Sequence, residues 1–338
     1  MKSCPKVSQM TESWKERKEV VLSFIVISYN AEATIGQCLE AIVGQNQDME
    51  IILVDNNSTD GTAIIGREYG VKVVTEKVKS RGIARNTGLR NAKGTYIAFI
   101  DSDVIIPPDW SKNAIGLLKE HRELAGVGGP GISPESKPTC LAMNTLQYGQ
   151  YIDSNSGHVK SLPTLAVLYR GSSIEDKWFK PLWTGEDAEF NFALIEDGKK
   201  LLWDATLKVT HFHLISLMEL AKKSLTYGKW YLVPYLFHPK LITAGVVSRV
   251  LFIPILAIAL FVVVTGAVSV VLVILLLMSP FLAYLFEGVR SKSLNNIGDI
   301  AKFVFVHSIR QYSQMLGIWL GILDLTVSKA LRLGKKYD

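Results

Sequence analysis

Two aspartates, Asp101 and Asp103, directly follow a short apolar segment at residues 96–100. Such a segment predicts a buried strand, and the carboxyl end of a strand is where α/β folds bind ligands. Two neighbouring carboxylates there repel each other and are costly to remove from water. A divalent cation would compensate both charges, and oxygen ligands suit Mg²⁺ or Mn²⁺. The pair therefore predicts a metal site, with a solvated, aspartate-capped turn as the alternative.

The bulk composition narrows the class of protein. The 338 residues allow one large domain with an appendage, or two domains. A net charge of +6 fits an anionic ligand or a membrane surface, and no run of like charges indicates a nucleic-acid partner. Three cysteines without metal or redox spacing predict reduced thiols in the cytoplasm. Residues 1–19 are polar, lack a signal-peptide core and are expected to form an N-terminal extension.

Residues 20–215 are predicted to form one α/β domain around a doubly wound, mostly parallel sheet. Apolar runs typical of buried parallel strands occupy residues 20–27, 50–54, 71–74 and 96–100. Helical spacing of apolar residues marks the intervening segments 33–45, 59–69 and 83–92. Strands that alternate with helices favour a parallel sheet with helices on both faces.

The loops that follow these four strands should meet at one edge of the sheet. They combine carboxylates, amides and arginines, a mixture that suits a nucleoside diphosphate together with a metal ion. Besides Asp101 and Asp103, the candidate binding residues in these loops are Ser28, Tyr29, Asn30, Asp55, Asn57, Arg81, Arg85, Asn86 and Ser102.

The C-terminal part is different, because residues 250–286 contain no charged side chain. One helix of that length would run roughly 55 Å, whereas the hydrocarbon core of a bilayer is about 30 Å thick. A turn at Thr265 and Gly266 would divide it, which predicts a transmembrane hairpin of two short helices over residues 246–287. A single long tilted span and a buried hairpin of a soluble protein are the alternatives. Basic residues on both sides, including Arg249 and Arg290, favour cytoplasmic ends.

The segments on either side of this hairpin mix apolar, aromatic and basic residues. Residues 216–245 are expected to form an amphipathic interfacial segment, and residues 288–338 an amphipathic helix with a basic end. Both could contact membrane lipids or pack on the α/β domain.

Four sequence motifs together resemble the family 2 glycosyltransferases, which have the GT-A fold. They are FIVISYN at 24–30, ILVDNNSTDG at 52–61, RGIARNTG at 81–88 and GTYIAFIDSD at 94–103. Their order and spacing match the family over roughly the first 215 residues. The resemblance implies an inverting transferase that uses a nucleotide-sugar donor.

The same resemblance implies roles for individual positions. Asp55 matches the acidic residue that contacts the nucleotide base, with Tyr29 beside it, and Arg81 a basic residue near the base or diphosphate. Arg85 and Asn86 occupy a position that supports the site, although Arg85 could equally be a structural ion-pair residue. Asp101 and Asp103 match the metal motif, with Asp103 as the more direct ligand. For Asp55 an Asx-turn with Asn56 and Ser58 is the structural alternative.

Two downstream groups complete the predicted site. Trp183 and Glu186 match the family's acceptor-site motif, in which Asp187 would be the general base. Capping of a helix N-terminus is the alternative for these acidic residues. His211 and His213 lie at the spacing that puts both imidazoles on one face of a strand. By the resemblance, His211 before His213 would face the metal or the diphosphate.

The sequence thus predicts an integral membrane enzyme with its catalytic domain at the cytoplasmic face. It would transfer one sugar to a polyprenyl phosphate or a lipid-linked glycan, an acceptor inferred from the tethering to the bilayer. The motif Gln-x-x-Arg-Trp of processive relatives is absent, which favours single-sugar transfer. A soluble or protein acceptor, with the hairpin as an anchor only, and a non-catalytic scaffold are the alternatives. A nucleotidyltransferase would need a lysine-rich loop after the first strand, where Ser28-Tyr29-Asn30 stands.

Overall fold

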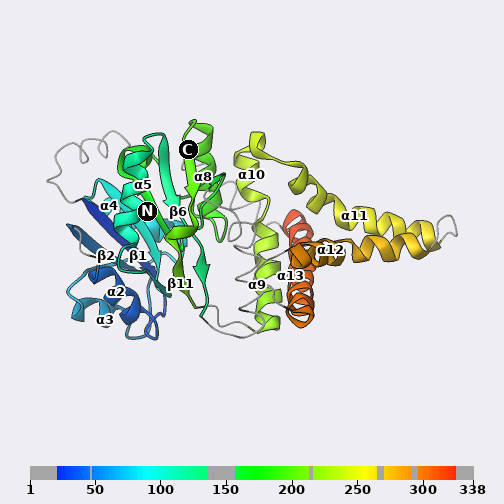
Figure 1. The fold of residues 1–338 in the computed structure, drawn as a ribbon, viewed down its shortest axis with the longest axis horizontal. Coiled ribbons are helices and arrows are strands. Elements are labelled where there is room, and N and C mark those ends of the chain that lie inside the picture. Colours follow the sequence, from blue (N-terminus) through cyan, green and yellow to red (C-terminus); the bar gives the residue numbers. More distant parts are fainter. Residues whose placement is uncertain are drawn as a thin grey trace. The chain divides into compact units, whose positions relative to one another are not determined.

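A computed structural model describes residues 21–45, 48–134, 140, 157–212, 216–264, 270–290 and 296–324. The described residues separate into two compact units, the first within 21–134 and 157–212 and the second comprising residue 140 and those within 216–324. Figure 1 shows strands in the first unit and long helices in the second. Each unit is described by itself.

The predicted alternation of strands and helices is confirmed in the first unit. Its elements are β1 (Leu22–Ser28), α2 (Ile35–Val43), β2 (Met49–Asp55), α3 (Thr62–Glu68), β3 (Lys72–Thr75), α4 (Arg81–Asn91) and β4 (Tyr96–Asp101). These four strands are parallel neighbours in the order β3-β2-β1-β4. The apolar runs of β1 and β4 are almost fully buried, as expected for strands covered on both faces, whereas β3 at the edge of the sheet is partly exposed.

The sheet continues past β4 with strands of mixed direction. The added elements are α5 (Trp110–Glu120), β6 (Leu124–Gly128), β8 (Gly157–Val159), β9 (Ala166–Arg170), α7 (Gly171–Ile174), α8 (Glu186–Glu196) and β10 (Lys200–Trp203). The full order is β3-β2-β1-β4-β9-β6-β10-β8. Strand β9 is antiparallel to both β4 and β6, and β8 is antiparallel to β10. The sheet is therefore mostly parallel, as predicted, with β9 and β8 as its antiparallel strands.

Helices cover both faces of this sheet, as Figure 1 shows. Leu53 pairs with Val26, the neighbour of Ile25, so Leu53 and Ile25 point to opposite faces. A Cβ atom on Gly66 of α3 would lie 2.4 Å from Leu53, and one on Gly88 of α4 would lie 2.3 Å from Ile25. Helices α3 and α4 therefore lie on opposite faces, which is the doubly wound arrangement that the sequence predicts.

Helix α8 shares its face with α4. Phe99 of β4 lies opposite Ile25 in the register and therefore points to the same face. The ring of Phe179 meets Phe99 edge-on at 5.2 Å and stacks on Phe190 of α8 at 4.1 Å. These aromatic contacts hold the first turn of α8 beside α4.

A second sheet of three short strands lies in the same unit. It consists of β5 (Val104–Ile105), β11 (Val209–His211) and β7 (Gly131–Ile132), with β11 in the middle. His211 pairs with Val104, the residue after Asp103. Two segments far apart in the sequence are thereby fixed side by side.

The second unit is helical. Its elements are α9 (Leu217–Trp230), α10 (Val233–Phe237), the 3₁₀ turn η2 (Pro239–Leu241), α11 (Ala244–Val264), α12 (Val270–Arg290) and α13 (Ile297–Leu323). Helices α9 and α13 cross with their backbones in contact. A Cβ atom on Gly228 would lie 2.2 Å from the carbonyl oxygen of Gln314, and one on Gly317 would lie 2.2 Å from that of Leu225. Only glycine permits so close a crossing.

The predicted pair of helices over residues 246–287 is present as α11 and α12, which contact each other. The expected turn at Thr265 and Gly266 lies outside the described residues. Within the described ranges, none of the helices combines the length and the apolar character needed to cross a membrane. The transmembrane part of the prediction is therefore not confirmed.

Candidate active site

Three of the predicted site residues lie in adjacent rows at one edge of the large sheet. Ser28 ends β1 and pairs with Asp55, which ends β2. Asp101 ends β4 and pairs with Ile27 of β1. The expectation that the carboxyl ends of these strands converge is confirmed, because β1, β2 and β4 are parallel neighbours.

The loops after β1 and β2 are joined by hydrogen bonds. The backbone N–H of Thr59 donates to Asn30 Oδ1 at 2.9 Å, and that of Asn30 donates to Ser58 Oγ at 3.0 Å. Asn30 has a φ of 49°, a left-handed conformation that asparagine tolerates. Asp55 is 5% exposed and accepts a hydrogen bond from Ser58 N, three residues on, at 3.2 Å, so its side chain stabilises the turn of its own loop. That turn leaves the other carboxylate oxygen of Asp55 outside the Ser58 hydrogen bond.

Asn56 fixes the third strand-end loop, a role that the sequence did not reveal. Its Nδ2 donates to the carbonyl oxygens of Glu76 at 3.1 Å and Val78 at 2.6 Å, and its Oδ1 accepts from Ser80 N at 3.2 Å. The predicted binding residue was its neighbour Asn57, which has a φ of 64°. The only signal in the sequence was that Asn56 follows a predicted strand. The residues that follow the other three strands share this position, so it did not single out Asn56.

Tyr29 lies at the exposed rim of this edge. Its hydroxyl lies 2.8 Å from Lys79 Nζ, which also stands 4.4 Å from the centre of the ring. Arg81 begins α4, whose N-terminus is capped by the Ser80 side chain. The region where Asp55, Tyr29 and Arg81 are expected to bind the nucleotide thus combines an aromatic face with basic groups.

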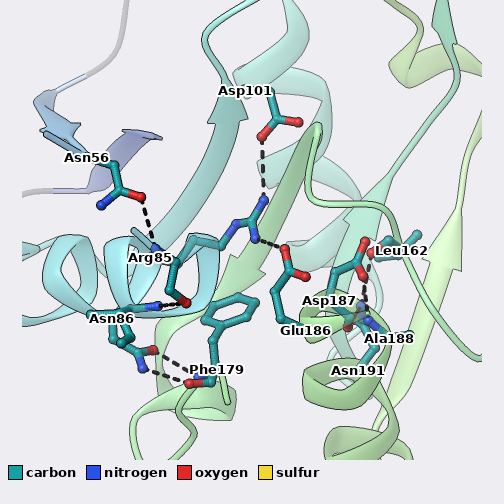
Figure 2. A network of polar contacts seen from close by, with 12 residues as sticks. Asn56, Arg85, Asn86, Asp101, Leu162, Phe179, Glu186, Asp187, Ala188 and Asn191 are labelled. Carbon is teal, nitrogen blue, oxygen red and sulfur yellow. Dashed lines mark hydrogen bonds and ion pairs between the residues drawn. The ribbon is translucent and has the colours of Figure 1, made fainter. Parts of the chain in front are cut away.

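Arg85 connects two carboxylates that come from different elements. Its Nη1 donates to Glu186 Oε1 at 2.6 Å, and its Nη2 lies 3.5 Å from Asp101 Oδ1. Figure 2 shows the guanidinium between the two acidic side chains. Arg85 is 2% exposed and Glu186 is 3% exposed, so this ionic contact is removed from water. Both predicted roles of Arg85, support of the site and ion pairing, fit this geometry.

Asn86, next to Arg85, has a structural role. Its Nδ2 donates to the carbonyl oxygen of Phe179 at 2.8 Å, and its Oδ1 accepts from the N–H of the same residue at 2.9 Å (Figure 2). This double hydrogen bond places the Phe179 ring against Phe190 of α8. Asn86 thus orders the elements beneath the site and contributes no free group to it.

Asp187 is the second residue of α8, which begins directly after Gly185, a residue with a φ of 84°. Its Oδ1 accepts a hydrogen bond from Ala188 N at 2.8 Å. Burial and then the neighbouring Glu186 raise its pKa to about 6, whereas Arg85 and Arg81 act to lower it. A carboxyl group with this pKa is mostly ionised at neutral pH and still basic enough to take up a proton. The site prediction for Asp187 therefore rests on a chemically suitable group.

A fully buried amide, Asn191, holds the backbone of Asp187. Asn191 Nδ2 donates to the carbonyl oxygens of Asp187 at 2.7 Å and Leu162 at 2.9 Å. The Tyr169 hydroxyl donates to Asn191 Oδ1 at 2.8 Å. Figure 2 shows this cluster on the side of Asp187 away from Arg85. Asn191 was not predicted, because its spacing within α8 resembles that of any helical residue.

Two of the predicted metal ligands, His211 and Asp103, lie close together. The pairing of β11 with β5 brings His211 Nε2 to 3.4 Å from Asp103 Oδ2. Asp101 stands at the end of the neighbouring strand, and burial and the Asp103 carboxylate raise its pKa while Arg85 lowers it. His213 lies outside the described residues. In the described part of the chain no group of three or more metal-ligating side chains has gathered.

These residues nevertheless suit a divalent cation. Two carboxylates and an imidazole are donors that Mn²⁺ accepts, and Mg²⁺ uses the carboxylate oxygens. The pKa of Asp101 is raised first by burial and then by the Asp103 carboxylate, so a cation beside both carboxylates would favour the ionised form of Asp101. Ser102 lies between the two aspartates in the sequence. Trp183 lies in the loop before α8, and its side chain is 65% exposed.

Comparison with known proteins agrees with the fold and with the motifs. The sequence model for glycosyl transferase family 2 matches residues 23–166. A dolichyl N-acetyl-alpha-D-glucosaminyl phosphate 3-beta-D-2,3-diacetamido-2,3-dideoxy-beta-D-glucuronosyltransferase of Methanococcus voltae is 25% identical over 244 residues, which are 61% of this chain and 71% of that protein. A putative glycosyltransferase, EpsH, of Bacillus subtilis (strain 168) is 36% identical over 109 residues, covering 30% of this chain and 32% of its own length.

A solved structure extends the likeness to both units. The mannosyltransferase PcManGT from Pyrobaculum calidifontis, in complex with GDP-Man and Mn²⁺, has a TM-score of 0.63 with this chain. The two are 15% identical, and the match covers 94% of this chain and 93% of the mannosyltransferase, which shows a shared fold. Residues 23–166 therefore match the family 2 glycosyltransferases, and the chain has the fold of a solved glycosyltransferase.

Proposed function

We propose that the protein transfers one sugar from a nucleotide-diphosphate sugar to an acceptor hydroxyl or phosphate, with inversion at the anomeric carbon. The observation that carries this proposal is the Arg85 bridge, which joins Asp101 at the donor edge to the turn that bears Asp187. A donor-binding edge and a general base are thereby held in one rigid cluster. Both are needed for a direct displacement.

The donor would lie along the carboxyl ends of β1, β2 and β4. Asp55 and Tyr29 would contact the base, and Arg81 and Lys79 would supply positive charge for the diphosphate; the burial of Asp55 and the contact between Lys79 and Tyr29 support this assignment. The mannosyltransferase of Pyrobaculum, which shares the fold, is a complex with GDP-Man. This supports a nucleotide-sugar donor at the same edge.

In the transfer, an acceptor oxygen forms a bond to the anomeric carbon while the bond from that carbon to the diphosphate oxygen breaks. When the acceptor is a hydroxyl, its proton passes to the Asp187 carboxylate; with either acceptor, the electron pair of the broken bond leaves with the diphosphate. Attack from the face opposite the leaving group inverts the anomeric configuration. A single base at the acceptor side suits this one-step route, and general base catalysis contributes about 10²–10⁴-fold.

The metal residues would be Asp101, Asp103 and His211, with His213 as a further candidate. A bound Mg²⁺ or Mn²⁺ would supply positive charge that stabilises the leaving diphosphate. The carboxylate and imidazole donors fit such an ion, and the related structure contains Mn²⁺.

The acceptor would be a polyprenyl phosphate or a lipid-linked glycan at the cytoplasmic face of a membrane. The Methanococcus relative carries a dolichyl phosphate substrate in its name. Helices α11 and α12 also expose apolar side chains over much of their lengths: Leu251, Ile255, Ile258, Leu260, Ile274, Leu275, Leu282 and Phe286. Apolar surface of this extent marks an interaction site, and we propose that it attaches the protein to lipid.

The test is a transfer assay with a panel of nucleotide sugars, Mn²⁺, and polyprenyl phosphate in vesicles, with the anomeric configuration of the product read by NMR. We expect inverted product with one donor class, and we expect Asp103→Ala to remove the dependence on Mn²⁺ of donor binding measured by calorimetry. Transfer to a soluble acceptor alone would reject the lipid-linked acceptor. Failure of all donors to bind would reject the enzyme in favour of a scaffold.

A further inference from the structure

The contact between Arg85 and Glu186 links α4 to α8 across 101 residues of sequence. Arg85 also reaches Asp101 at the end of β4. One guanidinium therefore touches three elements of the first unit, and two of its nitrogens face carboxylates (Figure 2). The third nitrogen, Nε, is buried and makes no hydrogen bond to the described residues.

This cluster resists displacement. Removing one member of a buried ion pair leaves the other charge uncompensated and is strongly destabilising. The guanidinium is further confined by the Phe179 ring, 5.5 Å from its central carbon. Gly88, one turn further along α4, has no side chain and so lets that helix lie close to Ile25 of β1. Arg85 thus has a fixed position from which to orient its acidic neighbours.

The two carboxylates are not held equally. Glu186 is hydrogen-bonded at 2.6 Å, whereas Asp101 is 3.5 Å away. Glu186 immediately precedes Asp187, so a hold on the Glu186 side chain fixes the turn that bears Asp187. On the opposite side Asn191 holds the Asp187 backbone. The two contacts together restrict how this turn can move.

We propose that Arg85 is a positioning residue which, through Glu186, sets the orientation and the charge state of the Asp187 carboxylate. This inference rests on the proposed function, because it assigns Arg85 a part in the same reaction. Arg85 itself touches neither reacting atom. The consequence is that loss of Arg85 impairs proton transfer more than donor binding.

The charges that face Asp187 give the direction of the pH effect. Glu186 stands beside it on α8, Arg85 and Arg81 face it from α4, and Tyr169 faces it from β9. Loss of the Arg85 charge favours the protonated form of Asp187, whereas loss of the Glu186 charge favours the ionised form. The two variants should therefore shift the acid limb of the pH–rate profile in opposite directions.

The experiment compares Arg85→Gln, Arg85→Lys and Glu186→Gln, with Arg90→Gln as the control on the exposed side of the same helix. We expect Arg85→Gln to lower kcat about 10²-fold, the effect of misplacing a catalytic group by about 1 Å, and to change the donor KM by less than about threefold. Its acid limb should move above pH 6, and that of Glu186→Gln below it. Arg85→Lys should restore the acid limb and part of kcat, and Arg90→Gln should match the wild type.

A loss confined to the donor KM, or acid limbs that stay in place, would overturn the proposal. Where Arg85→Gln does not fold, as judged by circular dichroism, Arg85→Lys and Glu186→Gln decide the outcome. A readout independent of transfer is the titration of ¹³C-labelled aspartate carboxyls by NMR, with Asp187→Asn to assign the signal. An Asp187 titration that moves as expected in a protein without transferase activity would support the positioning role and reject the proposed function. If the Asp187 titration does not move and the enzyme is active, the positioning role is rejected and the proposed function is supported.

Discussion

The site at the carboxyl ends of the parallel strands has two halves, which are held by different kinds of interaction. The amide half, formed by Asn30, Asp55 and Asn56, uses hydrogen bonds to backbone groups of neighbouring loops. The ionic half contains four side chains that carry charge: Arg85, Asp101, Glu186 and Asp187. In the amide half most bonds involve uncharged groups, so its shape should depend little on pH or salt.

From this difference we predict which half determines turnover and which determines donor binding. In the amide half a lost side chain changes the course of a loop, and the cost is that of a few hydrogen bonds. In the ionic half a lost side chain changes the charge state of its neighbours, because Arg85 and Glu186 are buried and Asp101 and Asp187 are only partly exposed beside them. Substitutions in the ionic half should therefore act on turnover, and those in the amide half on donor binding and stability.

The strongest way to break this comparison is Asp187→Asn. The substitution keeps the size of the side chain and removes its basicity, so we expect kcat to fall roughly 10³-fold with donor affinity nearly unchanged. Steady-state kinetics and calorimetric titration of the donor measure the two quantities. Turnover equal to that of the wild type would show that the ionic half does not contain the base.

The pH dependence sharpens the comparison without any substitution. Asp187 must be ionised to act as a base, and its pKa is raised to about 6. Activity should therefore be present above this pH and fall about tenfold per pH unit below it. The donor KM should change little over the same interval. A rate that is constant between pH 5 and pH 8 would contradict the assignment, and circular dichroism at each pH controls for unfolding.

The smallest expected effect belongs to Asn56→Ala in the amide half. The variant loses three hydrogen bonds, at about 1 kcal/mol each, so unfolding free energy should drop by roughly 1–3 kcal/mol. The loop that carries Lys79 and leads to Arg81 should lose its order, and the donor KM should rise several-fold more than kcat falls.

The matched control is Asn57→Gly. Its φ of 64° is one that glycine adopts freely, so we expect stability to stay within about 0.5 kcal/mol of the wild type. Denaturant unfolding and donor titration measure both variants. Equal effects of the two substitutions would mean that the contacts of Asn56 do not order this loop.

Much of the first unit was predictable, because its signals are local. Apolar runs marked the four parallel strands, and the polar residues after them identified the edge at which they converge. The antiparallel strand β9 was not predictable, since sheet order depends on pairings between distant segments. The position of His211 beside Asp103 depends on such a pairing as well.

The contacts within the site follow the same division. The sequence indicated Arg85, Glu186 and Asp187 by their motifs, but not that Arg85 joins the other two across the fold. Asn56 and Asn191 were missed because nothing near them in the sequence distinguishes a buried, fully bonded amide from an exposed one. Burial and partners of this kind are decided by tertiary structure.

The reversed direction of β9 also determines how this edge can be varied. The parallel strands release the chain at this edge, whereas β9 receives it there, since Asp101 N donates to the carbonyl oxygen of Leu165 just before β9 begins. At this edge the chain leaves the sheet after each parallel strand and enters it in the segment before β9, here called the incoming segment. Loops that follow parallel strands must lead on to the next helix, which limits their length. The incoming segment instead connects β8 to β9 and leads to no helix, so an engineer could graft a longer or differently charged stretch ahead of β9 and leave the order of the sheet unchanged.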